Sequence, residues 1–178
     1  MIFLNSTSDQ FGSRMIRYGR ESDSSHFAVC FGDFDDPCAM VIHSTMGRGV
    51  HPVWLKEFKK NNRVTSALKV DISRSENFDL YEKVGKEIGG KDYDQGAITY
   101  WVAVSLWQKI TGSVKVGKNK LGDDNEFYCV EVLWALREFL RMIELDFPND
   151  KEFFEMMDPQ DAYEWLKKSP FIKELNVG

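Results

Sequence analysis

Hydrophobic and polar residues follow two different periods along this chain, and together they predict an α+β domain. A strand is predicted at SHFAVCFGDF, residues 25–34, where His26, Ala28 and Cys30 would share one face and Phe27, Val29 and Phe31 the other. The segment DFDDP has the composition of a hairpin loop, and CAMVIHST, residues 38–45, is predicted to return as the next strand. Three further strands are expected, at residues 1–5, 63–72 and 170–178.

Helical spacing of apolar residues accounts for most of the remaining chain. Helices are predicted at residues 10–20, 51–61, 75–90, 97–112, 127–145 and 157–169. Ser75 and Asp158 are the expected N-caps of two of them, with Pro52 and Pro159 in first turns. A polar loop is expected at residues 113–126. Because no long linker divides the chain, we expect a single domain with a mainly antiparallel sheet packed on helices.

The composition restricts the class of protein without identifying it. A net charge of -5 and a sequence pI of about 5.3 argue against nucleic acid as a partner, since that would require a basic surface. The longest apolar run, residues 97–107, is too short to be a transmembrane segment and is predicted as a buried helix. The odd count of 3 cysteines and a first segment unlike a signal peptide favour a reducing, cytoplasmic location.

Cys129 lies in the first predicted turn of the helix at residues 127–145, directly after a polar stretch. Unpaired backbone N–H groups and the helix dipole favour an anion at such a place, so a thiolate would be stabilised there. The same amides could stabilise an oxyanion on a carbonyl under attack. A half-buried cysteine packing as a small hydrophobic side chain is the alternative, and this segment by itself favours it.

A nucleophilic thiol needs a base, and the chain has 3 histidines, which are His26, His43 and His51. His26 begins one predicted strand and His43 ends the next, so an antiparallel hairpin would bring them together. One ring would then act as the base while the other orients it. Two alternatives stay open: ordinary strand-end histidines, or a zinc site of His26, His43 and Cys129, whose spacing is unlike that of structural zinc sites. His51 is expected at a surface helix start.

The order of these residues resembles the circularly permuted papain-like (NlpC-like) cysteine hydrolases, and in particular their YaeF/YiiX-like branch. The matching segments, in chain order, are SRMIRYGRESDSSHFAV, MVIHSTMGRGVHPVWLKEF, the Gly-x-x-Tyr-Asp turn GKDYDQG, FYCVEVL and DPQDAYEWLKKSPFIKEL. Together they cover most of the chain. In ordinary papain-like enzymes the cysteine helix precedes the histidine, and here that order is reversed. The resemblance implies a permuted papain-like α+β fold for residues 1–178.

Carried onto these segments, the resemblance implies that Cys129 is the nucleophile, His26 the general base and His43 the third, orienting residue. YiiX-like relatives often have Glu at this third position, whereas the lecithin:retinol acyltransferase group tends to have His. Val130 stands where a small Ser usually follows the nucleophile. Glu131 is retained, and we expect it to have a structural role. The backbone N–H of Cys129 is the expected oxyanion donor.

Cys30 and Cys38 are expected to pack within strands, and Tyr93 and Asp94 to form a turn that shapes the cleft. The implied activity is cleavage of an amide bond through a Cys-His-His site and an acyl-enzyme, with no cofactor or metal. The expected substrate is a peptide, a peptidoglycan-like molecule or an acyl-amide. The alternatives are acyltransferase or thioesterase chemistry on the same fold, and a catalytically silent binding module. The substrate itself and the oligomeric state are left open.

Overall fold

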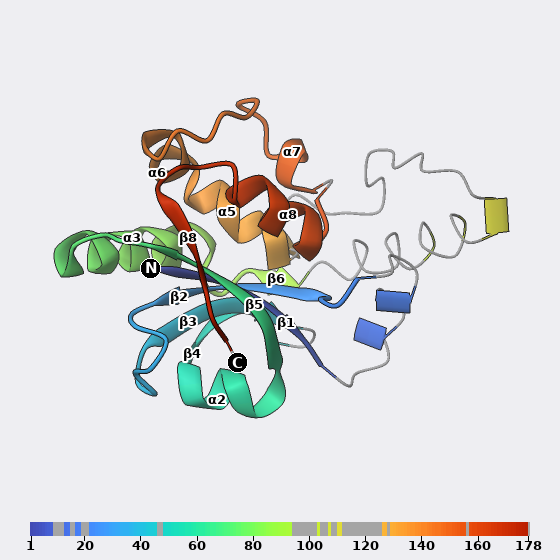
Figure 1. Ribbon diagram of the computed structural model, residues 1–178, viewed down its shortest axis with the longest axis horizontal. Coiled ribbons are helices and arrows are strands. Elements are labelled where there is room, and N and C mark those ends of the chain that lie inside the picture. The colour runs from blue at the N-terminus through green and yellow to red at the C-terminus, as the bar shows by residue number, and fades with distance from the viewer. Residues whose placement is uncertain are drawn as a thin grey trace.

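The computed structural model describes residues 1–8, 13–14, 17–18, 22–45, 48–93, 103, 107, 110–111, 126–127, 129–155 and 157–177. At its centre is a six-stranded sheet with the order β4-β3-β2-β1-β5-β8, in which all neighbours pair antiparallel (Figure 1). The six strands are β1 (Ile2–Thr7), β2 (His26–Phe31), β3 (Met40–Thr45), β4 (Gly49–Trp54), β5 (Arg63–Val70) and β8 (Ile172–Leu175). The predicted α+β class with a mainly antiparallel sheet is confirmed.

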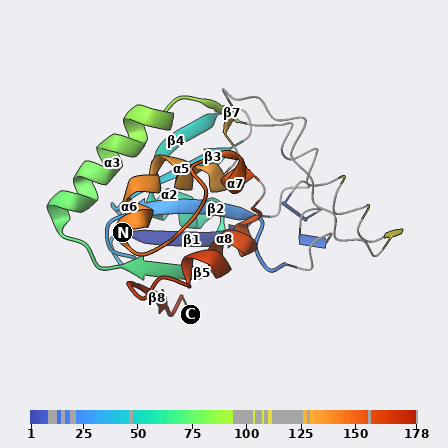
Figure 2. The ribbon, with the colours of Figure 1, turned by 90° about the horizontal axis from the view of Figure 1, so that it is seen from above.

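Helices cover both faces of this sheet. On one face lies α2 (Leu55–Asn61), and the other carries most of the remaining helical elements (Figures 1 and 2). These are α3 (Arg74–Ile88), the 3₁₀ turn η1 (Cys129–Glu131), α5 (Val132–Ala135), α6 (Arg137–Met142), α7 (Glu152–Glu155) and α8 (Pro159–Leu166). A separate parallel pair is formed by β6 (Asp92–Tyr93) and β7 (Glu126–Phe127).

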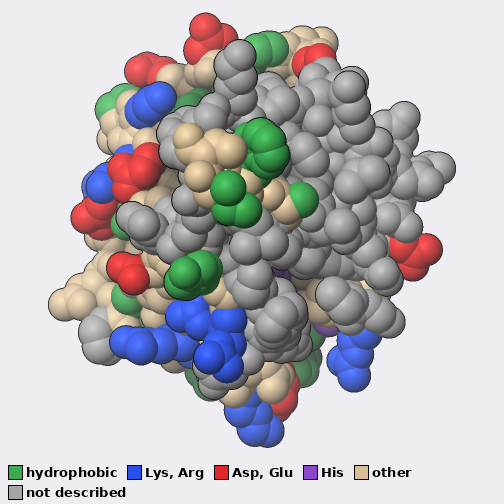
Figure 3. Space-filling model, turned by 90° about the vertical axis from the view of Figure 1, so that its right-hand side faces the viewer, with side chains coloured by type: hydrophobic (Ala, Val, Ile, Leu, Met, Phe, Trp, Pro, Cys, Tyr) green, Lys and Arg blue, Asp and Glu red, His purple; other side chains and the backbone are tan. Residues whose placement is uncertain are grey.

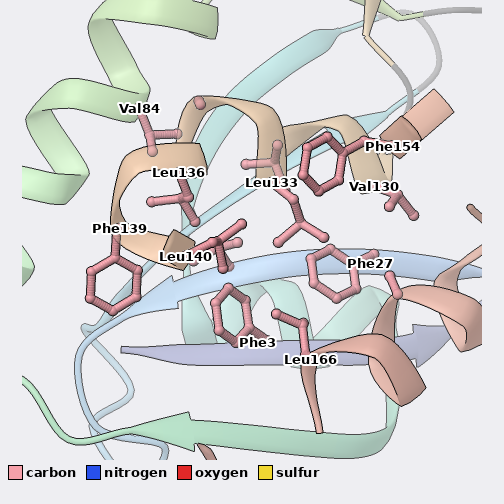
Figure 4. Close-up of a cluster of buried hydrophobic side chains, with 14 of the residues drawn as sticks. Phe3, Phe27, Val84, Val130, Leu133, Leu136, Phe139, Leu140, Phe154 and Leu166 are labelled. Atoms are coloured by element: carbon pink, nitrogen blue, oxygen red, sulfur yellow. The ribbon is translucent and has the colours of Figure 1, made fainter. Parts of the chain in front are cut away.

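Each face of the sheet has its own hydrophobic core, because successive strand residues point to opposite sides. Phe3 and Phe27 project from β1 and β2 toward Leu133 and Leu140 of the upper helices (Figure 4). The opposite face packs Leu4, Ala28 and their neighbours against Leu55 and Phe58 of α2. Burial of one such large side chain stabilises the fold by roughly 1.5–3 kcal/mol.

The predicted long helix at residues 127–145 is wrong in its details, since the structure divides it into four short pieces. It begins as the strand β7, tightens into the 3₁₀ turn η1, and continues as α5 and α6, which are separated at Leu136. Two β-branched residues, Val130 and Val132, lie at the start, where they lower helix propensity. Cys129 therefore opens a three-residue 3₁₀ turn, and the α-helix that follows it has only 4 residues.

The predicted helix at residues 51–61 starts later than the proline suggested. Residues 49–54 form β4, and α2 begins at Leu55. Proline lacks the N–H that a central strand needs, but β4 is an edge strand, where Pro52 costs no ladder hydrogen bond. His51 is therefore a strand residue and does not start a helix.

The cap predictions are half right. Asp158 caps α8 as expected, with Pro159 following and Asp161 completing a capping box. The helix α3 starts two residues earlier than predicted, because Ser73 and Glu76 form its capping box and Ser75 lies within the first turn. Gly89 ends this helix, as predicted.

The described residues of two other predicted helices are helical. These are residues 13–14 and 17–18 of the first, and residues 103, 107, 110 and 111 of the second. The second helix was expected to be buried, yet Trp107 and Ile110 are 61% and 80% exposed. Hydrophobic side chains reach the surface on this side of the molecule (Figure 3). The predicted loop at residues 113–126 lies almost entirely outside the described residues. Within the described part of the chain, no helix has the length and apolar character needed to cross a membrane.

A buried ion pair ties η1 to the segment that leads into α7. The Nζ atom of Lys151 lies 2.8 Å from Oε1 of Glu131, whose side chain is 2% exposed. We expect Lys151→Met to lower the free energy of unfolding by about 3 kcal/mol, because it leaves a buried carboxylate without its counter-charge. Urea denaturation followed by circular dichroism measures this loss.

The matched control is Lys173→Met. Lys173 Nζ lies 3.0 Å from Oδ2 of Asp71, but both side chains are exposed to solvent, at 73% and 61%. An exposed pair contributes little, so the unfolding midpoint should hardly move. Equal losses in the two variants would contradict the role of Lys151 as the anchor of η1.

Candidate functional site

The candidate site lies where two neighbouring strands stop pairing. The β2–β3 ladder joins Phe31 to Met40 and ends at the pair of Val29 with Ile42. Beyond that pair, β2 continues to His26 along β1, while residues 43–45 of β3 continue along β4. The backbones of β2 and β3 therefore part at one end of the sheet, and side chains occupy the space between them.

His26 and His43 meet in this opening, as the sequence predicted. The Nε2 atom of His26 lies 3.2 Å from Nδ1 of His43, within hydrogen-bond distance. The ring centroids are 5.4 Å apart, and the planes cross at 72°. Since a neutral imidazole has one donor and one acceptor nitrogen, one ring donates and the other accepts.

Phe58 of α2 forms an apolar wall beside both rings. Its ring centroid lies 6.1 Å from that of His26 and 5.2 Å from that of His43. Burial, followed by the charge of His51, lowers the pKa of His26 to about 4. Burial, followed by His26, His51 and Arg48, lowers the pKa of His43 to about 2. Both rings are therefore neutral near pH 7.

Cys129 approaches the same end of the sheet from the opposite side. Its side chain is 2% exposed and belongs to the core that also contains Phe27. The turn η1 contacts both β2 and β3, and Val130 lies above Phe27 in Figure 4. Strand alternation directs Phe27 toward η1 and His26 toward Phe58. A contact between the thiol and the His26 ring would have to form at the end of the sheet where β2 and β3 part.

Glu131 holds η1 in place, which agrees with the structural role expected for it. Besides Glu131, Lys151 also lies 3.5 Å from Glu155 of α7. Burial alone would lower the pKa of Lys151, but Glu131 and Glu155 together hold this pKa above its ordinary value. The ammonium group thus stays charged and links the cysteine turn to α7.

His51 is the residue that sequence analysis misplaced. It lies on β4 directly opposite His43 in the β3–β4 register, with the two ring centroids 4.6 Å apart. Pro52 is compatible with a helix start and with an edge strand, so the local sequence does not decide where His51 lies. The proline was interpreted as a helix start, and this choice removed His51 from the site.

The other residues singled out from the sequence are two cysteines and the expected turn of Tyr93 and Asp94. Cys30 is buried in β2, and burial raises the pKa of its thiol to about 12. Cys38 was expected to pack within a strand, but it is exposed and lies before β3 begins. Tyr93 belongs to β6 and pairs with Phe127 of β7. Asp94 lies outside the described residues.

A metal centre is not assembled in the part of the chain that the structure describes. Among those residues, no group of three or more His, Cys, Asp and Glu side chains is placed to hold a metal ion. The zinc alternative for His26, His43 and Cys129 therefore has no geometric support in this arrangement.

Comparisons with known proteins give a likeness at the level of the fold. No protein-family model matches the chain, and no curated protein matches it significantly. Among solved structures, the chain is similar to the crystal structure of metalloprotein YiiX from Escherichia coli O157:H7, with a TM-score of 0.51 and 15% sequence identity. The match covers 98% of this chain and 94% of that chain. The protein thus has a YiiX-like fold. In this chain, the six-stranded antiparallel sheet carries His26 and His43.

Proposed function

We propose that this protein is a thiol-dependent hydrolase of the permuted papain-like type, which cleaves an amide bond through Cys129. His26 is the general base, and His43 orients it. The observation that carries the proposal is the 3.2 Å contact between Nε2 of His26 and Nδ1 of His43, at the end of the sheet that η1 contacts. A base oriented by a second polar group is one part of the arrangement that nucleophilic catalysis requires, and the proposal adds Cys129 as the nucleophile.

The hydrogen bond decides which nitrogen of His26 can act. If Nε2–H of His26 donates to Nδ1 of His43, the Nδ1 atom of His26 keeps a lone pair. That lone pair accepts the thiol proton of Cys129 as sulfur attacks the carbonyl carbon. His26 then donates this proton to the leaving amine, and an acyl-enzyme remains. Water, deprotonated by the same Nδ1 atom, attacks the acyl carbon and releases the acid.

The low pKa values of the two rings define the resting state of this site. With a pKa of about 4, His26 is neutral near pH 7, so it is ready to accept a proton. The resting pair is therefore a neutral thiol beside a neutral imidazole, and not a thiolate beside an imidazolium. When His26 becomes charged during attack, the Nδ1 lone pair of His43 accepts its Nε2–H and stabilises the cation.

The short helix after η1 affects how the thiol of Cys129 is activated, through the base or through the helix dipole. A four-residue α5 has a small dipole, so the helix terminus contributes less to thiol ionisation than the sequence suggested. Proton transfer to His26 then supplies most of the activation. The backbone N–H of Cys129 remains the proposed oxyanion donor.

The proposed substrate is a peptide, a peptidoglycan-like molecule or an acyl-amide. The same acyl-enzyme would make the protein a thioesterase or an acyltransferase if the bond or the acceptor differed. YiiX is called a metalloprotein, and two imidazole nitrogens 3.2 Å apart would suit two ligands of one zinc ion. Among the described residues, no group of three or more His, Cys, Asp and Glu side chains is placed to hold a metal ion, and no step is assigned to one.

Covalent labelling tests the proposal and separates it from a silent binding module. A peptidyl acyloxymethyl ketone at pH 7 should modify Cys129, because the warhead presents a carbonyl to an activated thiol. Changing His26→Gln should slow this labelling by about 100-fold, which is the contribution of a positioned general base. Peptide mapping by mass spectrometry gives both rates.

Cys38 supplies the control within the same molecule, since it is an exposed thiol away from the site. Its slow alkylation by iodoacetamide should be the same in wild type and in His26→Gln. Cys30, which is buried with a raised pKa, should react last in the folded protein. Two results would favour the binding module: iodoacetamide that modifies Cys129 no faster than Cys38, or a rate of ketone labelling at Cys129 that does not change in His26→Gln.

The acid limb of the pH–rate profile should report the pKa of His26. The base works only when neutral, so activity is full above this pKa and is lost as the pH falls through it. We expect the acid limb of kcat/KM, or of the labelling rate, near pH 4 and well below the 6.5 of an ordinary histidine.

Variants at position 43 show whether this residue orients the base. In His43→Glu, a carboxylate would stabilise the His26 cation, so activity should persist while the acid limb moves to higher pH. In His43→Leu, the hydrogen bond is lost, and the rate should fall much further without such a shift. Wild-type rates and profiles in both variants would remove His43 from the site.

A further inference from the structure

His51 extends the histidine pair into a row of three. It faces His43 across the β3–β4 ladder, with the ring centroids 4.6 Å apart and the planes inclined by 50°. The side chain of His43 is 6% exposed, whereas His51 is partly exposed. The row thus runs from the edge strand β4 through the buried His43 to His26 on β2.

The carbonyl group of Gly49 fixes the orientation of His51. Nδ1 of His51 lies 2.9 Å from this oxygen. A carbonyl can only accept, so Nδ1 carries the hydrogen, and Nε2 of the neutral ring keeps a lone pair.

Gly49 itself has little freedom to move. Its φ of 63° is a left-handed conformation that suits glycine. A Cβ atom at this position would lie 2.1 Å from the carbonyl oxygen of Lys91, so the chain approaches too closely for a side chain. The N–H of Val50 donates to that same oxygen at 2.8 Å. The acceptor that holds His51 is therefore part of a rigid corner.

The second ring nitrogen of His43, Nε2, is left without a hydrogen-bond partner by the described residues. Its Nδ1 atom is occupied by His26, while its Nε2 atom is buried and has no hydrogen-bond partner among the residues that the structure describes. Leaving a buried donor without a partner costs about 1–3 kcal/mol. No direct hydrogen bond joins Nε2 of His43 to His51, but the ring of His51 is close enough to accept from this nitrogen through one bridging water.

We propose that His51 is a positioning residue, which fixes the tautomers of His43 and His26 in turn. Nδ1–H of His51 donates to Gly49, and Nε2 of His51 accepts from Nε2–H of His43 through one bridging water. Nδ1 of His43 must then accept from Nε2–H of His26, so the lone pair of His26 is left on Nδ1. This inference rests on the proposed function only for its consequence, which is that the base nitrogen is the one available to Cys129.

Imidazole ¹⁵N NMR measures the tautomers directly, and the sequence has only 3 histidines to assign. At pH 7, two-bond ¹H–¹⁵N correlations should show Nε2–H on His26 and on His43, and Nδ1–H on His51. His51→Phe removes the acceptor while keeping a ring of similar size. In that variant, we expect His43 to shift toward Nδ1–H and His26 with it, and the labelling of Cys129 by the ketone to slow by about tenfold or more.

His51→Gln is the matched variant, because its side-chain oxygen can still accept from His43. It should keep the wild-type tautomers of His26 and His43. Nδ1–H on His43 in the wild type, or unchanged tautomers in His51→Phe, would overturn the inference. If His51→Phe fails to fold, the wild-type tautomers decide the question.

The two proposals fail in different ways. If the tautomers are as predicted but Cys129 does not react, the hydrolase proposal is wrong and the proposed role of His51 stands. If Cys129 is reactive but the tautomers of His26 and His43 are unchanged in His51→Phe, the hydrolase proposal stands and the proposed role of His51 is wrong.

Discussion

The hydrogen bond between Nε2 of His26 and Nδ1 of His43 joins β2 to β3 beyond the point where their backbone ladder ends. Two strands that part expose backbone groups and leave a gap in the core, and the imidazole pair fills this gap with one polar contact. Phe58 closes the gap from the α2 side and keeps the rings neutral by excluding water. Burial is the main reason why the pKa of each ring lies below its ordinary value.

The other half of the site depends on how firmly η1 is held. The turn is only three residues long, so its own hydrogen bonds cannot fix it. Packing of Val130 and Leu133 against the sheet supplies one constraint, and the buried pair of Glu131 with Lys151 supplies another. A buried ion pair adds little net stability but strongly disfavours arrangements in which either charge is alone. It therefore suits the task of holding a short turn in a single position.

The sequence predicted most strands correctly, because short apolar runs such as the one that contains HFAVCF are bounded by turn residues. The contact between His26 and His43 followed from their places at the ends of a hairpin. Prediction failed where two local signals competed. Pro52 is compatible with a helix start and with an edge strand, and only the sheet order decides between them.

The helix at residues 127–145 failed for a different reason. Its apolar spacing is helical throughout, but Val130 and Val132 lower the helix propensity at its start, and the helix breaks again at Leu136. The place of His51 beside His43 was also missed, since His43 lies on a neighbouring strand that local sequence does not bring near.

The central claim is that the thiol of Cys129 reaches His26 through the opening between β2 and β3. A crystal structure of the protein with a peptidyl ketone bound covalently tests it most directly, through the distance between Sγ of Cys129 and Nδ1 of His26. The account predicts a separation within about 4 Å, with Nε2 of His26 still paired to His43. A sulfur atom that stays beyond reach of both ring nitrogens of His26 while the ketone is bound would contradict it.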